Sequence, residues 1–254
     1  MAVLPDGGAA ATFDDQVRLE KTERVLGGAD TSPANRHGLV CARRTRYLLN
    51  RMNGTVQQAV WTTIVITATD PAAFTVPANV VSALLTGKAP GGGGAYSATS
   101  SVPGGGEGAS IQDYPVTLVP GAVMAATIGA VGVGGTVGTP NGTDGGNCTF
   151  AGITLGGGRG AVANINGPGG MGGTVTLNGI VYSGAPGQAP PNLIIGGSGG
   201  GQGGGLGTAG IGAAGVNGGG GAGGGGTGSP WNGGNGGPGY FVLKVLTLQP
   251  IYTV

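Results

Sequence analysis

The sequence predicts a mostly β protein in which short strands alternate with glycine-rich, polyproline-II-like helices, after a short N-terminal helical anchor. Two observations carry this prediction, because glycine and charge occupy opposite parts of the chain. Of the 63 glycines, 57 lie between Gly87 and Gly239, whereas 14 of the 21 charged side chains lie in residues 1–54. We therefore expect two domains, residues 1–54 with a helix and residues 55–254 with β-strands and polyglycine-II segments.

The expected helix begins near Ser32-Pro33, where a capping hydroxyl precedes a proline at the first helical position. It ends near Met52, and its inward stripe would be Cys41, Thr45, Leu48 and Met52, spaced 4, 3 and 4. A seam of about two heptads is marginal alone. It could pack in a bundle of identical chains or against its own domain, and both alternatives stay open.

Short runs rich in Val, Ile and Thr, bounded by Pro, Gly and Asn, predict the strands of the second domain. The expected strands are residues 62–69, 80–86, 115–119, 122–128, 149–155, 174–177 and 240–248. The last run is the most hydrophobic, and we expect it to close a sheet.

Glycine tracts separate these strands, above all residues 196–239, where 26 of 44 residues are glycine. A flexible linker is the usual interpretation of such composition, but it does not explain the apolar strand that follows. Collagen requires glycine strictly at every third position, and the run 218–221 breaks that rule. A bundle of polyproline-II-like segments fits better, because such a helix has no internal hydrogen bonds and its backbone groups can bind neighbouring segments.

Local spacing supports the bundle, because glycine recurs at every third position in two places. These series are Gly129, Gly132, Gly135 and Gly138, and Gly212, Gly215, Gly218, Gly221 and Gly224. With three residues per turn each series lines one face, which we expect to be buried, while Ala213, Ala214, Val216 and Asn217 lie on the other faces.

Composition also argues against several function classes. The formal net charge of +1 gives no electrostatic case for nucleic acid, and no run reaches the roughly 18 apolar residues of a membrane span. Cys41 and Cys148 are spaced for neither a metal site nor a disulfide framework. We expect buried free thiols, and folding in a reducing cytoplasm.

An enzymatic function is not expected. Glu107, Asp113 and Asp144 are interior acids of the glycine-rich part, scattered among Gly and Ser, and we expect solvated loop carboxylates in place of a catalytic pair. His37 is the single histidine, so no Ser-His-Asp arrangement is available in the second domain. No phosphate-loop or cofactor motif rises above glycine composition, so we expect no cofactor and no metal.

Two sets of residues resemble segments of bacteriophage tail fibre proteins and distal tail adhesins. In the N-terminal part they are residues 23–28 (ERVLGG), 33–36 (PANR) and 44–48 (RTRYL). In the glycine-rich part they are residues 74–77 (FTVP), 80–85, 91–94, 116–121 (VTLVPG), 128–129, 149–150 and 155–158 (LGGG). Lys88 and Pro90 depart from that pattern, since they interrupt the glycine run.

The resemblance implies a virion tail protein, a short fibre or tip, assembled in the host cytoplasm as a homotrimer. Residues 1–54 would attach to other tail or baseplate proteins, with Asn35, Arg36, Arg44 and Tyr47 as candidates. The glycine-rich part would bind a host-surface receptor, a polysaccharide, a pilus or an outer-membrane protein, during adsorption.

Receptor contacts are expected from aromatic side chains within glycine-rich loops and from amide neighbours, because aromatic anchors dominate binding surfaces. The candidates are Tyr96, Tyr182, Trp231, Asn192, Asn232 and Asn235. Each aromatic could instead cover a sheet edge or a bundle end. The competing function is a purely structural tail or capsid decoration protein, and a more distant one is an ice-binding glycine-helix protein.

Overall fold

The structure, a computed structural model, describes residues 57–250 except 165–166, 193–194, 205–210 and 226–230. The chain divides into two compact units, residues 61–247 and the two chain ends, 1–60 with 248–254. The described part is mostly β and contains no helix, which confirms the predicted fold class in this respect. The predicted N-terminal helix and Cys41 lie outside the described residues.

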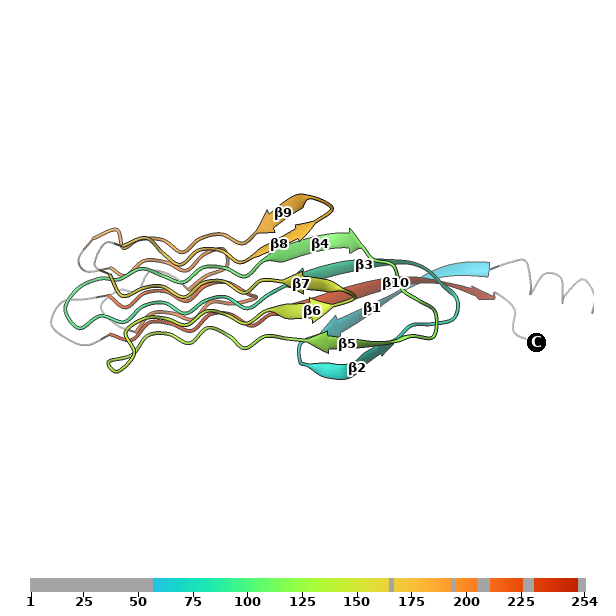
Figure 1. The fold of residues 1–254 in the computed structure, drawn as a ribbon, viewed down its shortest axis with the longest axis horizontal. Helices are drawn as coiled ribbons and strands as arrows, with labels where there is room; N and C mark the ends of the chain where they lie inside the picture. Colours follow the sequence, from blue (N-terminus) through green and yellow to red (C-terminus); the bar gives the residue numbers. More distant parts are fainter. Residues whose placement is uncertain (1–56, 165–166, 193–194, 205–210, 226–230, 251–254) are drawn as a thin grey trace, which may run out of the picture. The chain divides into compact units, whose positions relative to one another are not determined.

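Within the described residues, ten strands form three sheets (Figure 1). They are β1 (Gln57–Ile66), β2 (Asp70–Thr75), β3 (Val80–Lys88), β4 (Ser110–Pro115), β5 (Val123–Thr127), β6 (Cys148–Phe150), β7 (Ile153–Leu155), β8 (Thr174–Leu177), β9 (Ile180–Ser183) and β10 (Tyr240–Pro250). The sheet orders are β1-β10-β3-β4, β2-β5-β6-β7 and β8-β9. Strand β10 thus lies inside its sheet, where it pairs antiparallel with β3.

A hydrophobic core joins the two four-stranded sheets. Alternation along β10 buries Phe241, Leu243 and Val245 on one face, as expected for a strand with one face in the core. The rings of Phe150 on β6 and Phe241 on β10 lie 5.7 Å apart between centroids, so the core spans both sheets. Cys148 is buried in the same core as a free thiol, which confirms the prediction for this cysteine.

Gly87 makes room for the ring of Phe241 in this core. It lies opposite Phe241 in the β3–β10 register. A Cβ added to Gly87 would come within 2.4 Å of Cδ1 of the Phe241 ring and 3.1 Å of a Leu155 methyl. The side-chain-free position in β3 is therefore what lets Phe241 lie across the sheet.

Most predicted strands are present, with three corrections. The predicted strand 115–119 is wrong, because β4 ends at Pro115, a residue without an N–H for the ladder. The predicted strand 149–155 is two strands, β6 and β7, because Ala151 and Gly152 adopt positive φ in a tight turn. The strand 62–69 ends at Ile66, and β2 and β9 were not predicted.

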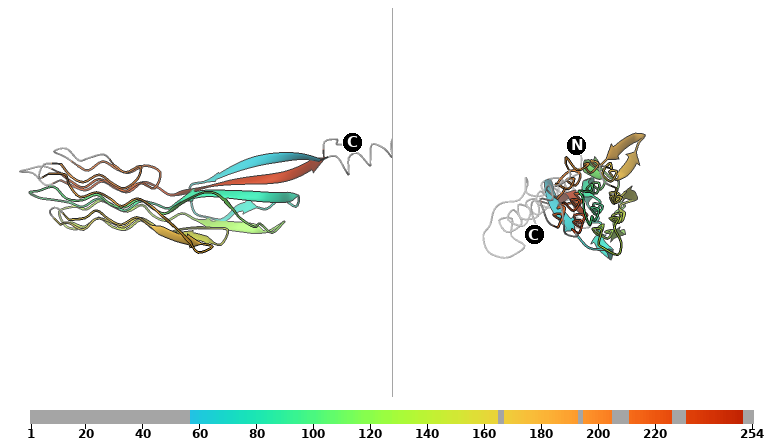
Figure 2. Two further views of the ribbon diagram at one scale, coloured as in Figure 1. Left: turned by 90° about the horizontal axis from the view of Figure 1, so that it is seen from above. Right: turned by 90° about the vertical axis from the view of Figure 1, so that its left-hand side faces the viewer.

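The glycine-rich tracts leave the sheets, turn, and come back, so that they run side by side (Figures 1 and 2). The tracts are residues 89–97, 101–109, 128–136, 140–147, 156–164, 167–173, 184–191, 195–204, 211–216, 218–225 and 231–239. They are neither helix nor sheet strand over most of their length. Backbone hydrogen bonds between tracts hold them together.

Tract 89–97 shows the bonding pattern most completely. Its backbone N–H groups donate to three neighbouring tracts, each neighbour being reached at every third residue: Gly91→Gly237, Gly94→Gly234 and Ser97→Trp231; Gly92→Gly106 and Ala95→Pro103; Gly93→Thr143 and Tyr96→Pro140. Its carbonyls accept from three further tracts: Gly158→Pro90 and Ala161→Gly93; Gly132→Gly91 and Gly135→Gly94; Gly221→Gly92 and Gly224→Ala95. Six tracts therefore surround this one.

Tracts 101–109 and 218–225 are enclosed in the same way, and the three together are called the central tracts. Nearly every residue in them is buried. Glycine is required there by distance: a Cβ on Gly94 would lie 1.9 Å from the carbonyl oxygen of Ala222, and one on Gly105 would lie 2.3 Å from that of Gly92. No Cβ can occupy such space, because the obstructing atoms are backbone.

The period-three glycine series are confirmed in part. Gly132 and Gly135 are buried and donate to Gly91 and Gly94, but Gly138 is exposed at a loop, where an added Cβ would meet nothing within 4 Å. In the second series Gly212 and Gly215 are buried while Ala213, Ala214, Val216 and Asn217 are exposed, as predicted. The second series is not one face of one segment, because the chain turns at Asn217 and Gly218, both of positive φ.

Candidate functional site

The loops that join outgoing to returning tracts gather at the end of the bundle away from the sheets (Figure 1). The described parts include residues 97–101, between the first two central tracts, and residues 136–139, where Thr136 and Thr139 exchange backbone hydrogen bonds. This loop end is the first candidate site, because connecting loops on a bonded scaffold are where proteins place binding residues.

The backbone segments that carry two of the aromatic candidates pair with each other at the loop end. Ser97, next to Tyr96, pairs with Trp231 through two backbone hydrogen bonds of 3.1 and 2.8 Å. Tyr96 is only 7% exposed and Trp231 is half-buried. Among the described residues, the indole Nε1 of Trp231 and the Oγ of Ser101 are buried without a hydrogen-bond partner. The arrangement joins segments more than 130 residues apart into one corner of the loop end.

Two of the three amide candidates accept hydrogen bonds from backbone N–H groups through their side-chain oxygens. The Asn235 side chain accepts a 2.8 Å hydrogen bond from the Gly134 N–H, and the Asn192 side chain accepts one of the same length from the Ile195 N–H. Asn232 is exposed beside Trp231. Of the three amides, Asn232 is thus the one whose side chain lies exposed next to the aromatic corner.

The remaining candidates lie elsewhere. Tyr182 is on β9 opposite Val175 and packs partly buried against the sheet core, so the structure does not bring it to Trp231. The tail-attachment candidates lie outside the described residues: Asn35, Arg36, Arg44 and Tyr47.

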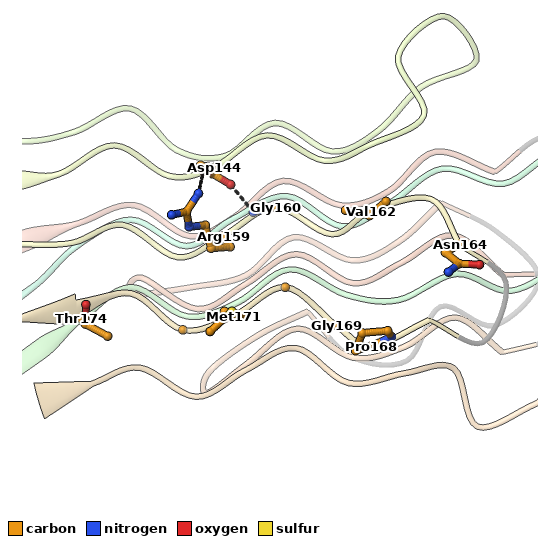
Figure 3. A pocket seen from close by; sticks show the side chains of 11 residues that line it. Asp144, Arg159, Gly160, Val162, Asn164, Pro168, Gly169, Met171 and Thr174 are labelled. Atoms are coloured by element: carbon orange, nitrogen blue, oxygen red, sulfur yellow. Dashed lines mark hydrogen bonds and ion pairs between the residues drawn. The ribbon is translucent and has the colours of Figure 1, made fainter.

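A second candidate is a groove along the side of the bundle (Figure 3), which the sequence did not reveal. Its volume is about 650 Å³, and tracts 156–164 and 167–173 supply most of its lining. Val162 and Met171 line it and are 62% and 73% exposed, respectively. The Asp144–Arg159 pair lies at the groove as well (Figure 3). No pattern in the sequence places these tracts side by side.

The interior acids are bound in ion pairs and backbone contacts. Arg159 Nη1 lies 3.1 Å from Asp144 Oδ2, and Lys244 Nζ lies 2.8 Å from Asp113 Oδ1. The Lys244 hydrogen bond holds the pKa of the Asp113 carboxyl below its ordinary value. Asp144 and Asp113 keep exposed side chains, 53% and 41%, as predicted, although each has a cationic partner and Asp113 lies on β4 and not in a loop. The prediction of a solvated carboxylate is wrong for Glu107.

Glu107 is the most enclosed of these acids. It pairs with Lys88, and both side chains are only 12% exposed. Its second carboxylate oxygen accepts a 2.8 Å hydrogen bond from the Ala185 N–H. The carboxylate thus ties the exit of β3 to the central tract 101–109 and to tract 184–191. Lys88, which departs from the tail-fibre pattern, has this structural partner.

Burial raises the pKa of the Cys148 thiol. Within the described ranges there is no group of three or more His, Cys, Asp or Glu side chains that could hold a metal ion. No helix among these residues is long and apolar enough to cross a membrane.

Neither a protein-family model nor a curated protein matches the chain.

Proposed function

We propose that the chain is a structural component of a bacteriophage tail, a short fibre or tip, that binds a host-surface receptor through the loop end of its glycine-rich domain. The observation that carries this proposal is the gathering of the loops at one end of a mutually bonded bundle (Figure 1). Loops held in this way can vary in sequence while the bundle keeps its bonds. The resemblance of residues 23–48 to tail-fibre anchors supports a second end that attaches to the virion.

We further propose that the glycine-rich tracts are polyglycine-II helices, left-handed with three residues per turn. Support comes from donors to one neighbour that recur at every third residue, as in Gly91, Gly94 and Ser97. Among the described glycines only five have positive φ, and all five lie at turns. Negative φ at the other described glycines is compatible with a polyproline-II backbone, in which φ is about −75°.

In this proposal residues 1–54 form the helical anchor that binds tail or baseplate proteins, and the protein assembles as a homotrimer in the host cytoplasm before it joins the virion. Its role is binding, without an enzymatic step or cofactor. In this proposal Trp231 and Asn232 form the receptor-facing corner, which the Ser97–Trp231 pairing supports, while Tyr96, 7% exposed, belongs to the scaffold beneath the loops.

The test uses the fluorescently labelled full chain and a panel of bacterial strains, with bound label measured by flow cytometry. Trp231→Ala should weaken binding to the recognised strain by about 30-fold or more, the loss expected for an aromatic anchor worth about 2 kcal/mol. Trp61→Ala is the matched control, because Trp61 lies on β1, away from the loops, and is 52% exposed.

Two outcomes would contradict the proposal. If Trp61→Ala weakens binding as much as Trp231→Ala, the loop end is not the receptor surface. If the folded chain binds no strain and virions that lack it adsorb normally, the chain is a decoration protein and the structural alternative holds.

A further inference from the structure

Three side chains on tract 140–147 form a ladder along the neighbouring tract 156–164. Asn141, Asp144 and Asn147 stand at every third residue, and each accepts a hydrogen bond from a backbone N–H that also recurs at every third residue. The pairs and their N···O distances are Ala163→Asn141, 2.8 Å; Gly160→Asp144, 2.8 Å; and Gly157→Asn147, 3.2 Å.

The ladder takes the place of a neighbouring tract. In the central tracts, such a three-residue series of N–H groups, for example that of Gly91, Gly94 and Ser97, ends on backbone carbonyls of an adjacent tract. On tract 156–164 the corresponding series meets side-chain oxygens. Arg159 binds the second oxygen of Asp144, which fixes this carboxylate over the Gly160 N–H (Figure 3).

A row of open N–H groups on an extended segment is a template for another chain, as at the exposed edge of a β-sheet. The carbonyls of a glycine tract in a second copy repeat with the same three-residue period as the N–H groups of this row. They can therefore pair with the row at each position, which the carbonyls of an irregular exposed loop cannot. Gly157 and Gly160 lack a Cβ where tract 140–147 packs against them, because a Cβ there would lie 2.0 Å from the carbonyl oxygen of Gly145 and 2.2 Å from that of Gly142, respectively. This close approach lets the side chains of tract 140–147 reach the row.

We propose that the ladder of Asn141, Asp144 and Asn147 is an edge guard: it closes the outer edge of tract 156–164 to the glycine tracts of a second copy of the chain. It keeps the lateral bonding of the bundle within one protein. This inference rests on the hydrogen bonds alone and does not depend on receptor binding.

The experiment compares the full chain with the triple variant Asn141→Ala, Asp144→Ala, Asn147→Ala. Hydrogen exchange at Gly157, Gly160 and Ala163 should accelerate by about 2- to 12-fold at low concentration, the loss of one ordinary hydrogen bond at each amide. Sedimentation velocity should then show species larger than the wild-type assembly, whose fraction rises with protein concentration.

A matched control exchanges the acceptors and keeps their geometry: Asn141→Asp, Asp144→Asn, Asn147→Asp. Each position retains an oxygen acceptor while the ion pair with Arg159 is lost, so this variant should sediment as the wild type does. The single variant Asn147→Ala supplies a milder form of the test if the triple alanine variant fails to fold.

Two results would overturn the inference. One is faster exchange at the three amides with unchanged sedimentation at every concentration, which would show that the open edge attracts no second copy. The other is association of the acceptor-exchange control to the same degree as the alanine variant, which would assign the effect to loss of the Arg159 ion pair, common to both variants, and not to the ladder.

Discussion

A Gly94→Ala substitution should destabilise the bundle by wedging two central tracts apart. The added Cβ would lie 1.9 Å from the Ala222 carbonyl oxygen and 2.4 Å from its carbon, and backbone cannot rotate away as a side chain can. Separating the tracts breaks the two hydrogen bonds that join them on either side of Gly94, Gly221→Gly92 and Gly224→Ala95, and disturbs the bond that Gly94 itself donates to Gly234, about three in all. At roughly 1 kcal/mol each, the loss is about 3 kcal/mol, offset by the roughly 0.4–1 kcal/mol that alanine contributes by restricting the unfolded chain.

The net effect of Gly94→Ala is therefore a loss of about 2–2.6 kcal/mol in the free energy of unfolding. For a unit of this size that corresponds to a fall in Tm of about 4–10 °C, which differential scanning calorimetry resolves. Gly138→Ala is the matched control, because an added Cβ there meets nothing within 4 Å and its φ is not positive. It should leave Tm unchanged or raise it slightly.

A Gly94→Ala protein that melts with the wild type would refute this reasoning, since it would mean that tracts 89–97 and 218–225 are not in contact. Equal losses for Gly94→Ala and Gly138→Ala would refute it too, because the effect would then come from glycine replacement in general and not from backbone contact.

Three further outcomes follow from the charged and sulfur-bearing side chains. Lys244 lowers the pKa of the Asp113 carboxyl, so this group contributes stability above its unfolded pKa of about 3.9 and loses that contribution as pH falls through the folded value. Asp113→Asn should therefore reduce the fall of Tm at acid pH in a series of Tm measurements against pH. An unchanged fall of Tm would contradict the role of Asp113. Glu107→Gln should lower the free energy of unfolding by about 1–3 kcal/mol, because Lys88 is left enclosed without its counter-ion; urea titration measures this, and stability equal to wild type would argue against the pair. Cys148, in a background without the other cysteine, should react with a thiol reagent only after unfolding, because it is fully buried and its pKa is raised; rapid labelling of the native protein would contradict the core described above.

Runs rich in Val, Ile and Thr, bounded by Pro, Gly and Asn, were sufficient to predict several strands that pack the sheet core. The runs that became β3, β8 and β10 were found in this way. The pattern failed where one residue ends a strand without changing hydrophobicity. Pro115 ends β4, and the Ala151-Gly152 turn divides an apolar run in two.

The arrangement of the glycine tracts could be predicted only one face at a time. Period-three spacing identified the buried face of Gly132 and Gly135, because glycine is needed on the side of a tract where the neighbouring backbone leaves no room for a Cβ. The spacing of glycines does not indicate which tracts become neighbours. Glycine offers no side chain to distinguish one tract from another, so the contact of Gly91 with Gly237 depends on the whole path of the chain.

The candidate site was predicted to a similar degree. Tyr96 and Trp231 were selected as aromatics in glycine-rich loops, and the structure brings their segments together. Tyr182 was selected by the same rule, yet it lies on β9 beside the core. The ladder over tract 156–164 was not predicted, because matching Asn141, Asp144 and Asn147 with donors in the next tract requires knowing that the two tracts are neighbours.

The enclosure of tract 89–97 has a consequence for the order in which the protein can form. The N–H of Gly91 binds Gly237, 146 residues later in the chain, so the six neighbours cannot all be in place until nearly all of the glycine-rich domain has left the ribosome. Pairings between such distant residues must close long loops before they contribute, which slows folding. The bundle should therefore assemble late and in a single concerted event, which is complete only when the last tract, 231–239, forms its hydrogen bonds with the earlier ones.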